Sequence, residues 1–354
     1  MAEAIAERVR RYILDGSDED LRRLLGVAES TREMARSAFR RVGMQEGWHV
    51  IDCGCGPIGG LAVMAEMAGP AGRVVGVDFS EPAIRRARSV VAALQLGNVE
   101  LFAGDIHELD AATVGGPFDL AYTRFFLMHQ PDPVRTLSQI ARLLRPGGWV
   151  VAQEALRSPP PRSYPHLDAL GAYWDLVYQV LERAGGVPHG AVDGLAGSAH
   201  AAGLDVVAVD GSFGIIDPAL GFDLHAATLL AARERAVASG IVTGQQIDDL
   251  VSDLHAAKSG GYEWVSMPFF LDLTLRKPLA ASLGPTPASR NDQGPGSSAP
   301  GGKPDRKTSR SLTTTRRSRD SRLLMARRSR PRIIVAGKAW SAVAWYAVVR
   351  TGML

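Results

Sequence analysis

Short apolar runs alternate with stretches of helical periodicity between Trp48 and Glu154. Such alternation is typical of a parallel β-sheet whose crossover connections are helices. The strands predicted from these runs are residues 48–52, 73–78, 99–103, 117–123 and 148–154. Because crossovers between parallel strands are right-handed almost without exception, the pattern predicts a doubly wound, mostly parallel α/β sheet with a ligand crevice at the carboxyl ends of its strands.

Helix start and stop signals fill the gaps between these strands. Ser80 is expected to cap a helix with a proline in its first turn. Asp132 begins another helix that runs to Leu144, and the Pro-Gly-Gly at 146–148 is expected to stop it. The crossovers of the predicted sheet therefore carry their own boundary signals.

Further elements are predicted on both sides of this core. Residues 3–43 have the pattern of two or more amphipathic helices that cover the crevice, with Ser30-Thr31 as the cap of the second. After the prolines at 159–161, helices are predicted at residues 164–184, 190–202, 217–238 and 244–257. Two β-like runs, Leu204–Val209 and Trp264–Leu275, are expected to close the sheet as an antiparallel pair.

Pattern and composition divide the chain into four parts. Residues 1–43 are the helical cover, 44–157 the ligand-binding α/β core, 158–278 the lid helices and closing strands, and 279–354 a tail without periodicity. The tail holds 15 Lys and Arg against 3 Asp and Glu, whereas the preceding residues hold 25 against 34, so the net charges are +12 and −9. A tail of this composition is predicted to be disordered.

Two other interpretations of the tail stay open. Arginine runs can form a nucleic-acid-binding arm, which here would use Arg316, Arg317, Arg319, Arg327, Arg328 and Arg330. The abrupt change after the last predicted strand also fits an unselected extension from readthrough or a shifted frame. An acidic body matches polyanionic nucleic acid poorly, so nucleic acid is not the expected partner.

The sequence carries no signal for a membrane or for export. The first twenty residues mix both charges among apolar positions, and the longest apolar run, Ile333–Val349, is interrupted by Lys338. A cytoplasmic protein without a membrane partner is expected. The only cysteines, Cys53 and Cys55, are too closely spaced for a mutual disulfide and lack further metal-ligand signals, so they are predicted to be buried thiols and no metal is expected.

A glycine-rich segment follows the first predicted strand and leads into a helix. Residues 50–60 read VIDCGCGPIGG, with glycines at 54, 56 and 59. Glycines permit a tight turn and let a ligand approach the backbone at a helix N-terminus. The pattern by itself fits a dinucleotide site as well as a methyl-donor site.

Three acidic residues at successive strand ends favour the methyl donor. Asp52 precedes the first glycine by two residues, where it would repel a pyrophosphate but suits the ammonium and sulfonium of S-adenosylmethionine. Asp78 ends the second strand, where a carboxylate accepts hydrogen bonds from ribose hydroxyls. Asp105, between Gly104 and Ile106, can accept from an adenine amino group while Ile106 packs on the ring. Each aspartate has the alternative role of capping the helix that follows it.

The sequence resembles the class I S-adenosylmethionine-dependent methyltransferases, in particular the ubiquinone/menaquinone-biosynthesis-like and natural-product group. The matching stretches are VIDCGCGPIGG at 50–60, VVGVDFS at 74–80, AGDIHEL at 103–109 and the segment 117–154. The resemblance implies a Rossmann-like methyltransferase fold with S-adenosylmethionine as the cofactor. The sequence departs from the family pattern at Ile58. The family usually has a third glycine at this position, whereas this chain has glycines at 59 and 60.

The resemblance also implies roles for individual residues. Asp52, Gly54 and Gly56 would hold the methionine portion, Asp78 the ribose, and Asp105 with Ile106 the adenine. Phe79 would lie near the adenine face. The other residues assigned to the cofactor site are Cys55, Gly104 and Arg124.

The acceptor is expected to be a small organic molecule that enters at the end of the fourth strand. The residues placed at this crevice are Tyr122, Thr123, Arg124, Phe125, Met128 and His129. His129 is the candidate general base if the acceptor is a hydroxyl, and the alternative is that it only lines the pocket. Arg124 either anchors a substrate carboxylate or pairs with a local acid. A substrate wall or core packing are the two interpretations of the aromatic residues Tyr164, Tyr173, Trp174 and Tyr178.

Three other functions remain to be weighed. An NAD(P)-dependent oxidoreductase would use the same glycine turn, and a non-catalytic partner subunit would bind the methyl donor without turnover. A nucleic-acid methyltransferase is disfavoured, because the Asn/Asp-Pro-Pro-aromatic signature of base amino-group methylation does not follow the fourth strand.

Overall fold

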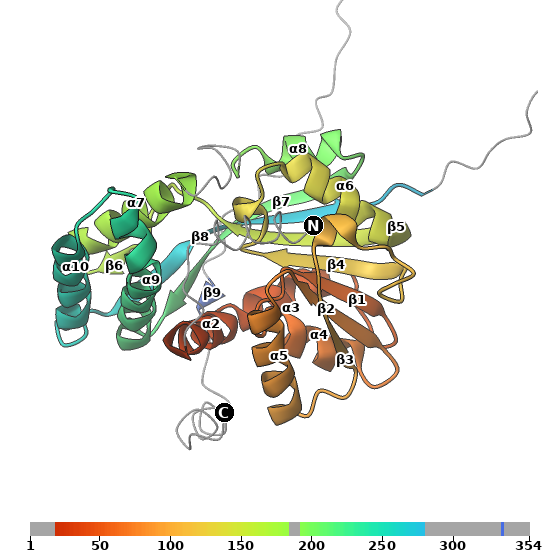
Figure 1. The fold of residues 1–354 in the computed structure, drawn as a ribbon, viewed down its shortest axis with the longest axis horizontal. Coiled ribbons are helices and arrows are strands. Elements are labelled where there is room, and N and C mark those ends of the chain that lie inside the picture. The colour runs from red at the N-terminus through yellow and green to blue at the C-terminus, as the bar shows by residue number, and fades with distance from the viewer. Residues whose placement is uncertain (1–17, 184–191, 280–333, 336–354) are drawn as a thin grey trace, which may run out of the picture. The chain divides into compact units, whose positions relative to one another are not determined.

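The computed structural model describes residues 18–183, 192–279 and 334–335. A mixed β-sheet lies at its centre, with the strand order β3-β2-β1-β4-β5-β8-β7-β9 and β6 paired to β8 (Figure 1). The strands are β1 (His49–Cys53), β2 (Arg73–Asp78), β3 (Val99–Ala103), β4 (Phe118–Arg124), β5 (Leu144–Ala155), β6 (Ser163–Tyr164), β7 (Asp205–Ile216), β8 (Trp264–Arg276) and β9 (Ile334–Val335). Neighbours from β1 to β5 are parallel, whereas β8 is antiparallel to both β5 and β7. The predicted doubly wound, mostly parallel α/β fold and its antiparallel closing pair are confirmed.

Helices cover both faces of the sheet. They are α2 (Asp18–Ser30), α3 (Arg32–Arg41), α4 (Leu61–Ala68), α5 (Glu81–Ala93), α6 (Pro133–Leu143), α7 (Asp168–Arg183), α8 (Leu195–Ala201), α9 (Pro218–Ala238) and α10 (Gly244–Ala257), with short 3-10 turns η1 (Ile106–Glu108) and η2 (Leu127–His129). α3, α4 and α5 lie on one face and α6 and α8 on the other (Figure 1). Each layer buries its own apolar cluster against the sheet, around Phe39 and Leu61 on the first face and Leu137 and Leu195 on the second.

Local signals explain where several of these helices begin. Ser80 caps α5 by accepting the backbone N–H of Ala83, and Asp132 caps α6 by accepting that of Arg135. Both caps are as predicted. Thr31 occupies the cap position of α3, but its side chain makes no cap bond there, because its hydroxyl donates to the Val27 carbonyl in the preceding helix.

Two predicted boundaries were wrong because tertiary pairing extends the strands. β5 begins at Leu144, not at 148, since Gly147 has a φ of 76° and donates to the Lys277 carbonyl, which keeps the Pro-Gly-Gly turn within the sheet. α7 begins at Asp168, not at 164, because Tyr164 belongs to β6 and pairs with Trp264. Tyr164 is 56% exposed and therefore forms no part of a helical substrate wall.

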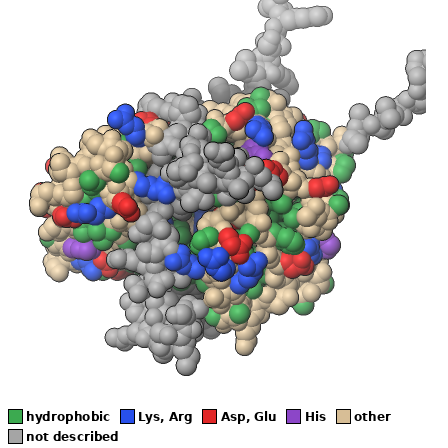
Figure 2. All heavy atoms as spheres, in the orientation of Figure 1, with side chains coloured by type: hydrophobic (Ala, Val, Ile, Leu, Met, Phe, Trp, Pro, Cys, Tyr) green, Lys and Arg blue, Asp and Glu red, His purple; other side chains and the backbone are tan. Residues whose placement is uncertain are grey.

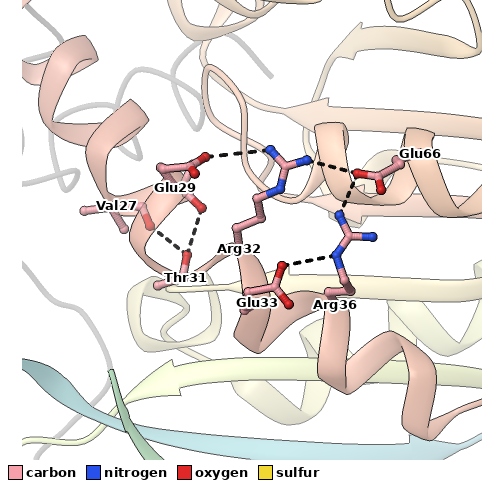
Figure 3. Close-up of polar contacts among 8 residues, drawn as sticks. Val27, Glu29, Thr31, Arg32, Glu33, Arg36 and Glu66 are labelled. Atoms are coloured by element: carbon pink, nitrogen blue, oxygen red, sulfur yellow. Dashed lines mark hydrogen bonds and ion pairs between the residues drawn. The ribbon is translucent and has the colours of Figure 1, made fainter. Parts of the chain in front are cut away.

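The N-terminal helices are joined to the core by ion pairs. Glu66 of α4 pairs with both Arg32 and Arg36 of α3, at 3.0 and 2.6 Å (Figure 3). Arg32 also pairs with Glu29 of α2, and Arg36 with Glu33 of α3. Basic and acidic side chains are likewise interspersed over the visible face in Figure 2. The guanidinium of Arg36 lowers the pKa of the Glu66 carboxyl.

The start of the predicted helical cover, residues 1–17, lies outside the described residues. The same is true of the predicted disordered tail and its arginines, apart from Leu279 and the short strand β9. Within the described part of the chain, no helix is long and apolar enough to cross a membrane. The cytoplasmic location stays a prediction.

Candidate functional site

The strand register brings the carboxyl ends of β1, β2 and β4 to one edge of the sheet. Asp52 pairs with Gly76 and with Tyr122, so the ends of the three strands lie side by side. The strand order reverses between β1 and β4, and α/β folds bind their ligands at such a switch point. A cavity of about 360 Å³ opens here. Its sequence-predicted lining residues are Asp52, Gly54, Cys55, Gly56, Asp78, Phe79, Arg124, Phe125, Met128, His129, Tyr173 and Trp174.

Asp52 lines the cavity from the end of β1. Its side chain is 1% exposed, and its Oδ2 accepts the backbone N–H of Gly60 at 2.6 Å. Burial raises the pKa of this carboxyl to about 7, against the opposing effects of the Gly60 N–H and the Arg124 guanidinium. A nearby cation would favour the ionised form of the Asp52 carboxyl.

Asp78 lines the cavity from the end of β2. Its Oδ2 accepts the N–H of Gly56 and its Oδ1 accepts that of Ser80, both at 2.9 Å. Burial raises the pKa of this carboxyl, and the two N–H donors oppose the rise. The same carboxylate therefore fixes the glycine-rich turn and faces the cavity.

The glycine-rich turn uses backbone conformations that favour glycine. Gly54 has a φ of +75°, and a β-carbon there would lie 2.2 Å from the Phe126 ring. Gly56 has a φ of +53° and no protein atom within 4 Å of such a β-carbon, so the backbone borders open cavity space. That opening is the kind of cradle in which a ligand approaches the main chain closely.

The delayed third glycine keeps the turn intact. Ile58 is 2% exposed and packs in the core, whereas Gly59 adopts a φ of +45°. A β-carbon on Gly59 would lie 2.4 Å from Oδ2 of Asp52. The glycine is therefore needed one position later, directly beneath the Asp52 carboxylate.

Gly104, Asp105 and Ile106 lie outside the lining of this cavity. Asp105 caps η1, with its Oδ1 accepting the N–H of His107 at 2.9 Å, and Ile106 is 5% exposed in the core. The segment is nevertheless adjacent to the site, because the Gly104 N–H donates to the Asp78 carbonyl. The adenine contact assigned to these residues stays a prediction.

Comparison with known proteins finds a methyltransferase domain in part of the chain. Residues 44–185 match the family described as "Methyltransferase domain". This part of the chain is a methyltransferase domain. A demethylmenaquinone methyltransferase of Geobacillus kaustophilus is 34% identical over 116 residues, which are 33% of this chain and 49% of that protein.

Two further similarities concern an uncharacterized relative and a solved structure. An uncharacterized 37.1 kDa protein in transposon TN4556 of Streptomyces fradiae is 33% identical over 161 residues, 46% of each chain. A SAM-dependent methyltransferase from Aquifex aeolicus aligns with 50% of this chain and 82% of its own, at 19% identity and a TM-score of 0.38. The chain spans about half the length of the curated relatives it matches.

Arg124 joins the methyltransferase domain to the N-terminal helices. Its Nη1 donates to the Thr31 hydroxyl between α2 and α3 at 2.5 Å, and its Nη2 donates to the Gly59 carbonyl at 3.0 Å. Both bonds are to neutral oxygens and not to an acid, so the two roles predicted for Arg124 stay predictions. Through these two bonds, Arg124 holds the end of α2 close to the glycine-rich turn.

Arg124→Lys is expected to weaken binding of S-adenosylhomocysteine about ten-fold, because a single ammonium cannot span both acceptors as a planar guanidinium does. Calorimetric titration measures the change. The matched control is Arg145→Lys, at the far end of the neighbouring strand, where the arginine pairs with Asp119. Equal affinities of the Arg124 and Arg145 variants would contradict this positioning role.

Glu154 supports the site from outside the cavity lining, and the sequence reasoning did not assign it. It is fully buried one residue before the end of β5, and its carboxylate accepts the N–H groups of Phe126, Leu127 and Met128 at 2.9 to 3.3 Å. Burial raises the pKa of this carboxyl to about 7, against those three donors. The available signal was its place at the last residue of a predicted strand, the same signal that marked Asp52 and Asp78.

Only some of the aromatic residues predicted to form a substrate wall line the cavity. Tyr173 and Trp174 of α7 line it. Tyr178 lies outside the lining and its hydroxyl donates to the Ala155 carbonyl, while Tyr122 is fully buried with its hydroxyl donating to Gln153. Thr123 is fully buried and also lies outside the lining.

His129 lines the cavity at the end of η2. Burial and the nearby Arg23 guanidinium lower the pKa of its imidazole to about 4. The ordinary pKa on which the general-base prediction depends is therefore not retained, and the imidazole is neutral at pH 7. Cys53 and Cys55 are buried free thiols whose pKa values burial raises, as predicted for inert cysteines.

Proposed function

We propose that the whole chain is an enzyme that transfers the methyl group of S-adenosylmethionine to a small organic acceptor by in-line displacement. The observation that carries the proposal is the convergence of Asp52 and Asp78 on one cavity, beside the open backbone at Gly56. Asp52 would hold the ammonium of the methionine portion and Asp78 the ribose hydroxyls, with Phe79 against the adenine. The cofactor supplies a methyl group already activated by its sulfonium.

This chain's own residues would then act mainly by positioning and by excluding water. Helices of the predicted cover and of the predicted lid contribute to the cavity wall: Arg23 and Val27 come from α2, and Trp174 from α7. The lowered pKa of His129 makes its imidazole a weak base, so its proposed role is to orient the acceptor or accept a hydrogen bond from it.

Calorimetric titration with S-adenosylmethionine, S-adenosylhomocysteine and NADH tests the proposal. We expect both sulfur compounds to bind at one site per chain and NADH not to bind. Binding of NADH alone would instead support an oxidoreductase, and the methyltransferase proposal would then be withdrawn.

Trp174→Ala is expected to raise the Michaelis constant for the acceptor about ten-fold with little change in cofactor affinity, because the indole lines the cavity. Steady-state kinetics with the acceptor measure both values. Tyr178→Phe provides the comparison, since Tyr178 lies outside the cavity lining, and loss of its hydrogen bond to the Ala155 carbonyl should cost about 1 kcal/mol of stability. An unchanged Michaelis constant in Trp174→Ala would remove the indole from the acceptor wall.

A further inference from the structure

The cavity wall that faces the glycine-rich turn is mainly apolar. It is built from α2, α7, α9 and β8, and its apolar side chains include Val27, Trp174, Val177, Leu224 and Met267. α2 and α9 pack closely here, because a β-carbon on Gly26 would lie 2.7 Å from Leu224. Such a wall suits a ligand with an apolar body.

One cation is buried within this apolar wall. Arg23 of α2 lines the cavity and is only 7% exposed. Its charge acts on two other lining residues: it adds to burial in lowering the pKa of His129, and it opposes the burial that raises the pKa of Tyr173. Arg23, His129 and Tyr173 therefore share one region of the cavity.

Two neutral polar side chains, Thr228 and His225, line the same cavity and contact Tyr173. The Tyr173 hydroxyl is hydrogen-bonded to Thr228, and the Tyr173 ring lies 4.8 Å from that of His225. Burial lowers the pKa of His225 to about 4, so this imidazole is neutral at pH 7. Arg235 also lines the cavity, two helical turns beyond Thr228 on the same face of α9.

The two carboxylates in the described lining of the cavity, Asp52 and Asp78, both lie at the glycine-rich turn, whereas arginines line it from α2, α5, β4 and α9. Arg124 is the cation that acts on Asp52. Arg23 and Arg235 come from the helices of the opposite wall. Where water is excluded, a guanidinium attracts an anion more strongly than in bulk solvent and binds carboxylates and phosphates in a fixed geometry.

We propose that the methyl acceptor is an organic anion with an apolar body, whose carboxylate or phosphate group binds Arg23 while its body packs against Trp174 and Leu224. This inference rests on the proposed methyltransferase function. An amine-bearing cation would be repelled from the same end of the cavity.

Calorimetric titration of the full chain saturated with S-adenosylhomocysteine tests the inference. The probes are 2-naphthoate, 2-naphthyl phosphate and the uncharged 2-naphthamide. We expect at least one anion to bind about ten-fold more tightly than the amide, and the stronger of the two to identify the acidic group. Arg23→Gln should reduce this preference to less than about two-fold, whereas Arg23→Lys, which keeps the charge, should retain part of it.

Arg233→Gln is the matched control. Arg233 lies on α9 two residues before Arg235, pairs with Asp248 and is 43% exposed, so its replacement should leave the anion preference unchanged. Equal binding of the amide and both anions to the unaltered chain would overturn the inference, as would a full preference in Arg23→Gln. Failure of S-adenosylhomocysteine to bind in the first titration would instead overturn the proposed function, so the two failures are distinguishable.

Discussion

Asp52→Asn is expected to weaken binding of S-adenosylmethionine about 100-fold, because it removes a charged partner for the ammonium from a buried site. Asparagine keeps an oxygen that can accept the Gly60 N–H, so the glycine-rich turn should persist. Calorimetric titration measures the loss. Asp248→Asn, at an exposed ion pair on α10, should bind the cofactor as the unaltered chain does.

The same residue predicts a pH dependence with a definite sign. Burial raises the pKa of Asp52 to about 7, so the carboxyl is mostly protonated at pH 6 and must ionise to hold a cation. Cofactor affinity should therefore rise with pH, about five-fold from pH 6 to pH 7, and the rise should be absent in Asp52→Asn. An affinity that is flat over this range in the unaltered chain would show that Asp52 does not contact the ammonium.

Glu154→Ala is expected to lower the free energy of unfolding by about 3 to 5 kcal/mol, because three buried N–H groups lose their acceptor. Cofactor affinity should fall as well, since the Phe126 ring that this carboxylate positions packs on Gly54. Denaturant unfolding and calorimetry measure the two effects. Glu154→Gln retains one oxygen for Phe126 and Leu127 and should lose only about 1 kcal/mol.

The raised pKa of Glu154 also predicts how the free energy of unfolding changes with pH. Its pKa is raised from the ordinary 4.5 to about 7 in the folded protein, so the folded state holds the proton more tightly than the unfolded state. Its contribution to the free energy of unfolding should therefore decrease as pH rises from about 4.5 to about 7. Glu154→Gln should show a shallower decrease over that interval, and an identical pH profile would contradict the assignment.

The positions of Asp52 and Asp78 in the cavity lining could be predicted from the sequence. Both end apolar runs whose strand character was clear, and parallel strands end at the same edge of the sheet, so their convergence was predictable. Glu154 carried the same signal but was missed, because its partners are backbone N–H groups of a turn whose path is set by tertiary packing. The pKa of His129 was misjudged for a similar reason, since burial and Arg23 come from segments distant in the sequence.

The sequence by itself determined the α/β fold, the caps at Ser80 and Asp132 and the glycine-rich turn, because strand periodicity, cap chemistry and glycine conformations are local properties of the chain. Only the tertiary structure decided which aromatic residues face the cavity, where β5 begins, and that Arg23 shares a cavity with His129. Those features depend on contacts between residues far apart in sequence. Their energies come from burial and long-range pairing, which no local pattern records.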